Sequence, residues 1–168
     1  MIATKLWQRP DAATAGFITP PGEGDDVPTK PGSRRKAFSG NTGGRFLVDE
    51  AVLAPGEAAP PHRHANLTEV FYVLEGELRL QVGDEIHPVT AGTFAFSPVG
   101  TVHSFANIGQ TTARMLIVAM PQDPEGQTIQ TVEAYFAALA EMPPPADRTA
   151  ADLAAWEELG RRAGIERA

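Results

Sequence analysis

The sequence predicts an all-β fold, a barrel or a sandwich, with an α-helical extension at its C-terminal end. The first observation is a series of short apolar segments between residues 45 and 120, separated by turns rich in Gly and Pro. The second is a change to helical spacing of the apolar residues after Pro121. A chain of 168 residues is long enough for one domain with a full core. We therefore expect a single β domain over residues 37–121 and a helical extension over residues 122–168.

The segment before the β domain, residues 1–36, is expected to be an arm of strand and loop. Residues 1–19 are mixed in character and can add a strand. Residues 20–36 are rich in Pro, Gly and charge, which is typical of a loop. We interpret residues 20–36 as a connector. The alternative is a flap near the mouth of the barrel, or an arm that reaches a second subunit.

Strands are expected where β-branched and aromatic residues cluster or alternate. At residues 78–82, apolar residues alternate with Arg79 and Gln81, which indicates a strand with one buried face. His87 lies in a hairpin turn and its exit, and we expect it to be a solvated surface residue. The expected strands are residues 46–48 and 51–53, as a pair or one bent strand, then 70–74, 78–82, 94–96, 103–106 and 113–119.

Two helices are expected in the extension. Thr149 followed by Asp152 resembles a capping box at the start of the second helix, and Gly164 fits its end. Three prolines at residues 143–145 separate the two helices. We expect both to pack on the outside of the barrel or at a dimer contact, with their aromatic residues in a core. The residues with helical spacing are Val132, Tyr135, Phe136, Leu139 and Ala140, then Leu153, Trp156 and Leu159.

Composition excludes several classes of function. The net charge is −7, and a stripe of basic residues, which nucleic-acid binders carry, is absent from the sequence. The chain has no cysteine, so disulfides, thiolate ligands and a cysteine nucleophile are excluded. The N-terminal residues lack the apolar core of a signal peptide, and no apolar run is long enough to span a bilayer. We expect a cytoplasmic protein that binds neither nucleic acid nor membranes.

The most informative residues are His62, His64 and Glu69. Five residues separate Gly56 from His62, four separate His64 from Glu69, and six separate Glu69 from Gly76. Two side chains spaced two apart on a strand share one face, so both imidazoles point to the same side. Strict alternation puts Glu69 on the opposite face. The polar stretch between His64 and Glu69 must therefore bend or bulge if the carboxylate is to join the histidines.

A second pattern supplies a third histidine. Pro98 and Gly100 predict a turn that leads into a new strand beginning at His103. Asn107 lies at the far end of that strand, and we expect it to order a turn rather than bind metal. Three imidazoles and one carboxylate suit a divalent first-row transition metal. We expect one such ion per subunit, iron, manganese, nickel, copper or zinc, held by His62, His64, Glu69 and His103.

These two patterns resemble the signature motifs of the cupin superfamily, and every specified position matches. The resemblance covers residues 45–120, with 15 residues between Gly76 and Gly92. It implies a double-stranded β-barrel of the cupin or jelly-roll type, with the metal near one mouth and the same four ligands. One copy of each motif implies one barrel. Thr93 departs from the acidic residue that many cupins carry at that position, which is expected to be in a turn.

Beyond the motifs, the sequence is similar to the single-barrel, quercetin-dioxygenase-like group of cupins. The segments that carry this likeness include residues 43–46, 60–64, 69–76, 102–107 and the C-terminal 156–166. In that group the glutamate can act as an acid/base for the flavonol hydroxyl, a role that the resemblance assigns to Glu69. This chain departs from the group by inserting Gln122–Gln130 before the helix, which is expected to reshape the mouth.

Three functions remain open from the sequence. The leading interpretation is a metal-dependent dioxygenase acting on a small aromatic or enol-type substrate. The alternatives are a non-oxidative metal enzyme, such as an isomerase, decarboxylase or lyase, and a ligand-binding cupin without turnover. Expected partners are a small-molecule substrate and a second copy of the chain in a homodimer. The expected substrate-pocket residues, each of which could equally be barrel core, are Phe71, Val73, Phe94, Phe96, Phe105 and Met115.

Overall fold

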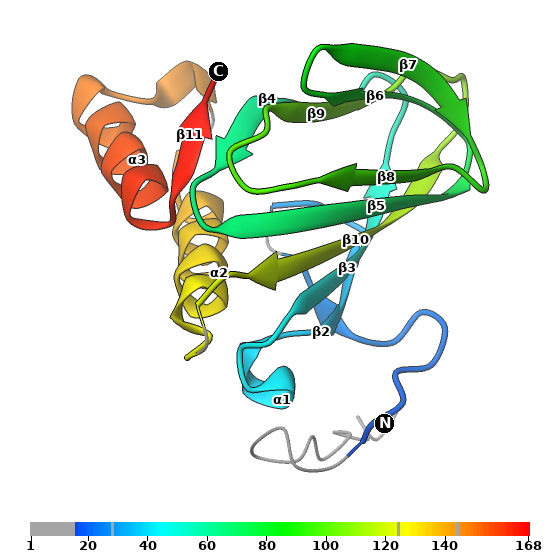
Figure 1. The fold of residues 1–168 in the computed structure, drawn as a ribbon. Coiled ribbons are helices and arrows are strands. Elements are labelled where there is room, and N and C mark those ends of the chain that lie inside the picture. The colour runs from blue at the N-terminus through cyan, green and yellow to red at the C-terminus, as the bar shows by residue number, and fades with distance from the viewer. Residues whose placement is uncertain (1–15, 28, 124, 144) are drawn as a thin grey trace, which may run out of the picture.

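The computed structural model describes residues 16–168 apart from 28, 124 and 144, and every structural statement below refers to these residues. Two antiparallel β-sheets face each other as a double-stranded β-barrel, and helices gather at one end of it (Figure 1). The predicted all-β class with a helical C-terminal extension is confirmed. The extra strand expected within residues 1–19 falls largely outside the described residues.

The larger sheet has six strands, and its central strand, β10, pairs with both β3 and β5. Inward residues of these strands alternate with residues on the outer face, as the period of two requires. In spatial order the strands are β1 (Asp25–Asp26), β2 (Arg34–Ala37), β3 (Leu47–Leu53), β10 (Ala113–Pro121), β5 (Leu67–Glu75) and β8 (Phe94–Ser97).

The smaller sheet has five strands and carries the histidines. One edge strand of this sheet, β11, comes from the C-terminal segment and pairs with the strand that holds His62 and His64. In spatial order the strands are β11 (Ile165–Arg167), β4 (Ala58–His64), β9 (His103–Asn107), β6 (Glu77–Val82) and β7 (Glu85–Thr90).

Four strands lie where the sequence pattern predicted none. β1 lies within the segment interpreted as a connector, β2 comes partly from it, and β11 follows the last helix. β7 contains His87, which is exposed as expected, and Pro88. Most residues of β7 are exposed, so the strand has no alternating apolar face for the sequence to reveal. An edge strand also tolerates a proline because one of its sides needs no ladder hydrogen bonds.

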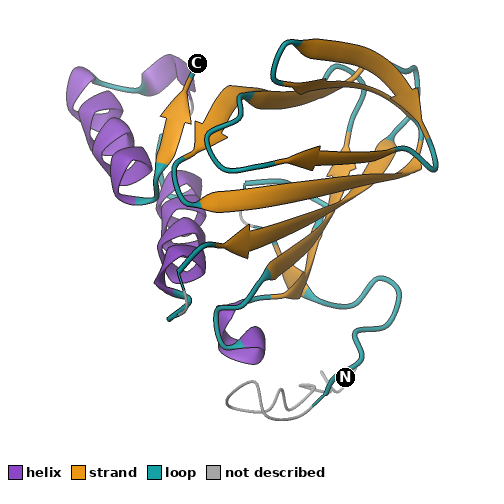
Figure 2. Ribbon diagram, in the orientation of Figure 1, coloured by secondary structure: helices purple, strands orange, loops and turns teal. Residues whose placement is uncertain are grey.

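The helices are α1 (Ser39–Thr42), α2 (Gln127–Ala140) and α3 (Ala150–Arg162), with a single 3₁₀ turn at Pro145–Asp147 between the last two. The predicted capping box is confirmed, since Thr149 and Asp152 each bond the other's backbone amide. Figure 2 shows α2 and α3 together at one end of the sheets. No helix of the described part is long and apolar enough to cross a membrane.

Two hydrophobic cores result from this arrangement. The first lies inside the barrel and includes Leu53, Phe71, Val73 and Met115. The second lies where the barrel end meets the helices, and joins barrel residues such as Leu47 and Leu67 to helix residues such as Ile129, Val132 and Tyr135. The helices therefore cover the end of the barrel nearest the histidines, which is why they matter to the site.

Candidate metal centre

Four side chains from three strands converge at one point inside the barrel. His62, His64, Glu69 and His103 each offer one ligand atom, and these atoms all lie within 4.8 Å of one another. His62 on β4 lies directly opposite His103 on β9 in the sheet register. Every residue that the sequence predicted as a ligand is therefore present in this one cluster.

The return of Glu69 to the histidines depends on a change of sheet. β4 ends at His64 in the smaller sheet, and β5 begins at Leu67 in the larger one. The bend at residues 65 and 66 interrupts the alternation of inward and outward side chains, so a new alternation begins at Leu67. Glu69 shares the inward face of β5 with Leu67 and Phe71, opposite the histidines. The predicted bend is thus a crossover between the two sheets.

Contacts on the far side of two rings leave the Nε2 atoms free to bind a metal. Nδ1 of His62 lies 2.8 Å from the carbonyl oxygen of Pro60. Nδ1 of His103 lies 2.9 Å from Oγ of Ser97 and 3.0 Å from the carbonyl oxygen of Thr101. Oxygens that accept a hydrogen bond place the ring proton on Nδ1, so Nε2 keeps its lone pair for an ion.

The electrostatics of the cluster favour the ligand forms of His62 and Glu69. Burial, followed by repulsion from His103, lowers the pKa of His62 to about 4, so its ring is neutral at pH 7. Burial alone raises the pKa of Glu69, but its interactions with His103 and His64 outweigh that effect and hold the pKa well below its ordinary range. Glu69 is therefore a carboxylate at any pH where the protein is used.

Buried ring nitrogens without hydrogen-bond partners indicate whether the site suits a metal. Both ring nitrogens of His64 and Nε2 of His103 are buried with no hydrogen-bond partner among the described residues. The two Nε2 atoms face Oε2 of Glu69 at 3.6 and 2.9 Å, respectively. Buried polar atoms without partners cost free energy, and a shared cation between these nitrogens and the carboxylate would satisfy them. The residues present fit a divalent metal ion.

The cluster opens into a cavity of about 260 Å³. His62, His64 and Glu69 form part of its wall. The rest comes from β3, β4, β9 and β10, from the segment before β2, and from α2, α3 and β11. Most of these contributions are apolar, and they include Phe105, Ile117, Val132, Tyr135, Phe136, Leu139, Trp156 and Ile165.

The predicted pocket residues fall into three groups. Phe105 lines the cavity. Phe71, Val73 and Met115 are buried in the inner core instead and are not in the cavity wall. Phe94 and Phe96 are 61% and 51% exposed on the outer face, which corrects the expectation that they point inward. On β8 the inward positions belong to the small residues at 95 and 97, because the first packs on the inner core and the second contacts His103.

Several cavity residues were not expected from the sequence. Lys30 and Ser33 belong to the segment interpreted as a connector, but this segment forms part of the cavity wall, so the flap-like alternative is nearer to the structure. Tyr135 and Trp156 were expected in a core or at a dimer contact, and they line the cavity as well as packing in the second core. Their helical spacing was visible, but nothing local indicates that the helices cover the histidine end of the barrel.

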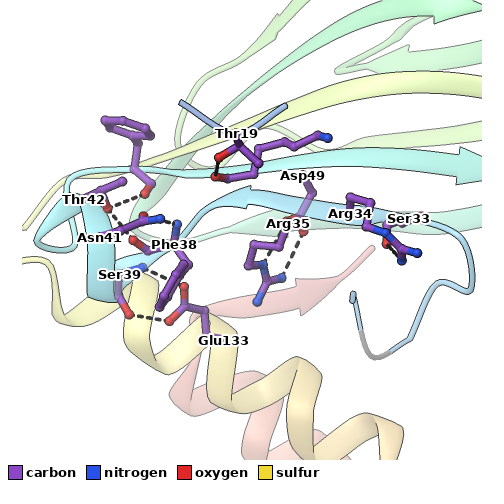
Figure 3. Close-up of polar contacts among 12 residues, drawn as sticks. Thr19, Ser33, Arg34, Arg35, Phe38, Ser39, Asn41, Thr42, Asp49 and Glu133 are labelled. Carbon is purple, nitrogen blue, oxygen red and sulfur yellow. Dashed lines mark hydrogen bonds and ion pairs between the residues drawn. The ribbon is translucent and has the colours of Figure 1, made fainter. Parts of the chain in front are cut away.

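A second carboxylate, Asp49, lies in the cavity wall. Figure 3 shows the guanidinium of Arg35 directed at it, with Nε 2.9 Å from Oδ1 and a second nitrogen 3.0 Å from Oδ2. Burial raises the pKa of Asp49 although the two hydrogen bonds from Arg35 oppose that rise. Nearby, Ser39 donates through its backbone and hydroxyl to Glu133, which ties α1 to α2. This polar layer fastens β2, β3 and α2 around the cavity.

Asn107 has the structural role that was expected. Its side-chain nitrogen donates to the carbonyl oxygens of Leu53 and Thr111, and its oxygen accepts from the amide of Gly109. It orders the closed end of the barrel, away from the histidines.

A double-stranded β-barrel with three histidines and a glutamate clustered beside an internal cavity is an architecture suited to a bound metal ion. Residues 50–119 match the family model described as a cupin domain. Protein SchB of Streptomyces halstedii is 30% identical over 105 residues, an alignment that covers 60% of this chain and 76% of SchB. The chain belongs to the cupin superfamily, with a single cupin domain in the sequence described.

Other similar proteins are named for activities that differ from one another. Quercetin 2,3-dioxygenase of Bacillus subtilis is 32% identical over 102 residues, covering 60% of this chain and 30% of the dioxygenase. A solved structure described as a predicted oxalate decarboxylase of Thermotoga maritima superposes with a TM-score of 0.51 at 26% identity, covering 53% of this chain and 78% of that one. The chain spans half or less of the length of several curated relatives.

Proposed function

We propose that this protein is a metal-dependent dioxygenase that acts on a small aromatic or enol-type substrate. The observation that carries the proposal is the opening of the His62, His64, Glu69 and His103 cluster into a cavity with a largely apolar and aromatic wall. A site that keeps open coordination positions beside a binding cavity suits catalysis better than a purely structural role. The likeness to quercetin 2,3-dioxygenase supports this choice of reaction.

Each part of the site has a role in this proposal. A bound divalent ion would supply Lewis acidity toward an oxygen of a chelating substrate. Glu69 is a half-buried carboxylate with two oxygens, so one could face the metal while the other accepts the proton of a substrate hydroxyl. Phe105, Ile117 and the aromatic residues of α2 and α3 hold the apolar part of the substrate and exclude water from it.

The test combines metal analysis with oxygen uptake. Purified protein is expected to contain about one divalent transition metal per chain, and a panel of flavonols and enediols is screened for substrate-dependent oxygen consumption. His64→Ala should abolish both signals, whereas the exposed His87→Ala should leave both unchanged. Full metal content together with no oxygen consumption across the panel would contradict the dioxygenase proposal.

A non-oxidative reaction, as an isomerase, decarboxylase or lyase, is the second candidate. The resemblance to the structure described as a predicted oxalate decarboxylase favours it. An anaerobic chamber separates the two candidates, because a lyase or isomerase turns over its substrate without oxygen. A cupin that binds its ligand without turnover would show saturable binding and no product in either atmosphere.

A further inference from the structure

One guanidinium group in the cavity wall has no carboxylate partner within the part of the chain that the structure describes. Arg167 on β11 lies directly opposite His62 on β4, and side chains at paired positions of antiparallel strands lie on the same face. Arg167 is part of the cavity wall. Its neighbour Glu166 points the other way and pairs with Arg63, at 2.6 Å. Among the described residues, no ion pair is formed by Arg167.

The position of this guanidinium is fixed by an aromatic ring. Its central carbon lies 3.6 Å from the centroid of the Trp156 ring, which is the geometry of a stacked cation–π contact. The indole nitrogen of Trp156 donates to the hydroxyl oxygen of Tyr135 at 2.7 Å, so the ring is held between α2 and α3. Stacking uses the face of a guanidinium and leaves its edge of N–H donors free. A stacked arginine can therefore bind a carboxylate through two parallel hydrogen bonds.

The charge balance of the cavity also favours an anion. Asp49 is neutralised by Arg35, and Glu69 belongs to the metal cluster. A second cation, Lys30, lines the cavity with its ammonium 5.2 Å from the centroid of Phe105 and 3.5 Å from Oε1 of Glu57. With a divalent ion bound, the cavity carries an excess of positive charge inside a chain of net charge −7.

We propose that the ligand of this cavity is a small organic acid with an aromatic or enol group, whose carboxylate is bound by Arg167. This inference rests on the proposed function for the role of the metal, but it concerns recognition rather than the reaction. In this arrangement the hydroxyl or enol oxygen faces the metal cluster, the apolar part contacts the aromatic wall, and the carboxylate meets the edge of the guanidinium. The cavity volume, about 260 Å³, suits a ligand of one ring.

The test compares two probes that differ in charge. 2-Hydroxybenzoate and 2-hydroxybenzamide share a ring and a hydroxyl, and only the first is an anion at pH 7. Binding of each to metal-loaded protein is measured by calorimetry without oxygen. The unsubstituted protein should bind the acid at least about tenfold more tightly, because a charge-assisted pair is worth more than a neutral hydrogen bond. Arg167→Met should reduce that ratio to about one, with unchanged metal content and circular dichroism.

Arg148 offers a matched control. Its guanidinium lies 4.9 Å from the same Trp156 ring, but it is not among the residues of the cavity wall. Arg148→Met should keep the preference for the acid. Equal binding of the two probes by the unsubstituted protein, binding of neither, or a preference that survives Arg167→Met would overturn the proposal. So would a preference lost in Lys30→Met and kept in Arg167→Met.

The outcomes separate this inference from the proposed function. A preference for the acid that depends on Arg167, in a protein that consumes no oxygen with any substrate, would keep the anion site and reject the dioxygenase. Oxygen consumption with neutral substrates, together with no preference for the acid, would keep the dioxygenase and reject the anion site.

Discussion

The ring of His103 is oriented by contacts that lie outside the metal cluster. Ser97 on β8 and the carbonyl of Thr101 both contact its Nδ1, and Phe71 lies beside the ring with centroids 5.7 Å apart. Ser97 is 1% exposed, so its hydroxyl is shielded from bulk water. At the scale of single residues, the site therefore depends on neighbours of the ligands as well as on the ligands.

Removal of a ligand histidine is expected to abolish most metal binding. His64→Ala and His103→Ala each remove one of four donors, and the remaining three no longer close around the ion. Glu69→Gln keeps one oxygen for the metal and should retain part of the metal content while losing the ability to accept a proton, at a cost of at least about 100-fold in turnover. Metal content is measured by elemental analysis of purified protein. Full occupancy in His64→Ala would contradict the site.

Ser97→Ala tests the orientation of His103. Loss of a hydrogen-bond partner behind a ligand histidine typically lowers metal affinity about 10- to 100-fold. The control is Ser104→Ala, next to His103 on β9, because the Ser104 hydroxyl donates to Gln81 rather than to a candidate ligand histidine. Competition with a fluorescent chelator measures the affinities. Equal affinities for the two variants would show that Ser97 does not position His103.

At the scale of elements, the connection between β4 and β5 is held by the C-terminal segment. The amide of Ala65 donates to the carbonyl of Gly164 at 2.7 Å, and the side chain of Asn66 donates to Thr128 on α2 at 3.1 Å. β11 then continues along β4 past both ligand histidines. The helical extension thus supports the backbone that carries His62 and His64.

Gly164→Ala is expected to disturb this connection. Gly164 has a φ of +67°, and an added Cβ would lie 2.6 Å from Oδ1 of Asn66. Gly56→Ala is the matched control, since Gly56 has a φ of +80° and nothing within 4 Å of an added Cβ. Gly56→Ala should cost about 1–2 kcal/mol of unfolding free energy from the left-handed backbone alone. Gly164→Ala should cost more and also lower metal affinity, as urea denaturation and chelator competition would show.

Glu50 links three strands of the larger sheet, and its ion pairs are expected to make the stability of the protein depend on pH. It lies 3.2 Å from the ammonium of Lys36 on β2 and accepts from Arg114 on β10. The hydrogen bond from Arg114 is the main cause that lowers the pKa of Glu50 below its ordinary value of 4.5. A lowered pKa in the folded state adds stability above about pH 4.5, and this stability is lost as the pH falls through the folded-state pKa.

Glu50→Gln should therefore destabilise the protein at pH 7 and lose this effect in acid. The expected cost is about 1 kcal/mol or less, because Arg114 is 43% exposed and solvent screens the pair. Glu77→Gln, at an exposed position that begins β6, is the control. Urea denaturation at pH 7 and pH 3 gives the comparison. A destabilisation of equal size at both pH values would rule out the ion pairs as its cause.

At the scale of the whole molecule, the outer face of the larger sheet carries exposed aromatic residues. Tyr72 on β5 lies opposite Phe94 on β8, and Phe96 follows on the same face. An apolar surface of this kind is typical of a protein–protein contact. The helices, which were expected to pack on the outside of the barrel or at a dimer contact, direct Tyr135, Phe136 and Trp156 toward the cavity and the second core.

We therefore expect a homodimer formed through this sheet face. Light scattering of the unsubstituted protein should give the mass of two chains of 17.9 kDa each. Phe94→Glu should shift the mass toward one chain without loss of folding, because the side chain is 61% exposed. Ile86→Glu, at another exposed position, should remain dimeric. A single-chain mass for the unsubstituted protein at micromolar concentrations would contradict this expectation.

The four candidate ligands and the capping box at the start of α3 could be predicted from the sequence because both depend on local spacing. His62 and His64 are two apart on one strand, and Thr149 and Asp152 are three apart at a helix start. The sequence did not predict which side chains of β8 point into the barrel. Phe94, Ala95 and Phe96 are all apolar, so alternation leaves the inward face undefined. In the structure the small residues Ala95 and Ser97 point inward, where Ala95 packs on the inner core and Ser97 contacts His103.

The sequence by itself determined the all-β class, the helical extension and the four candidate metal ligands, since each follows from a period or a spacing within a short segment. Only the tertiary structure decided the composition of the cavity. Lys30, Trp156 and Arg167 are far apart in the chain, and they reach one cavity because the segment before β2, helix α3 and strand β11 pack around the barrel opening. Contacts between such distant segments depend on complementary surfaces, which leave no local pattern in the sequence.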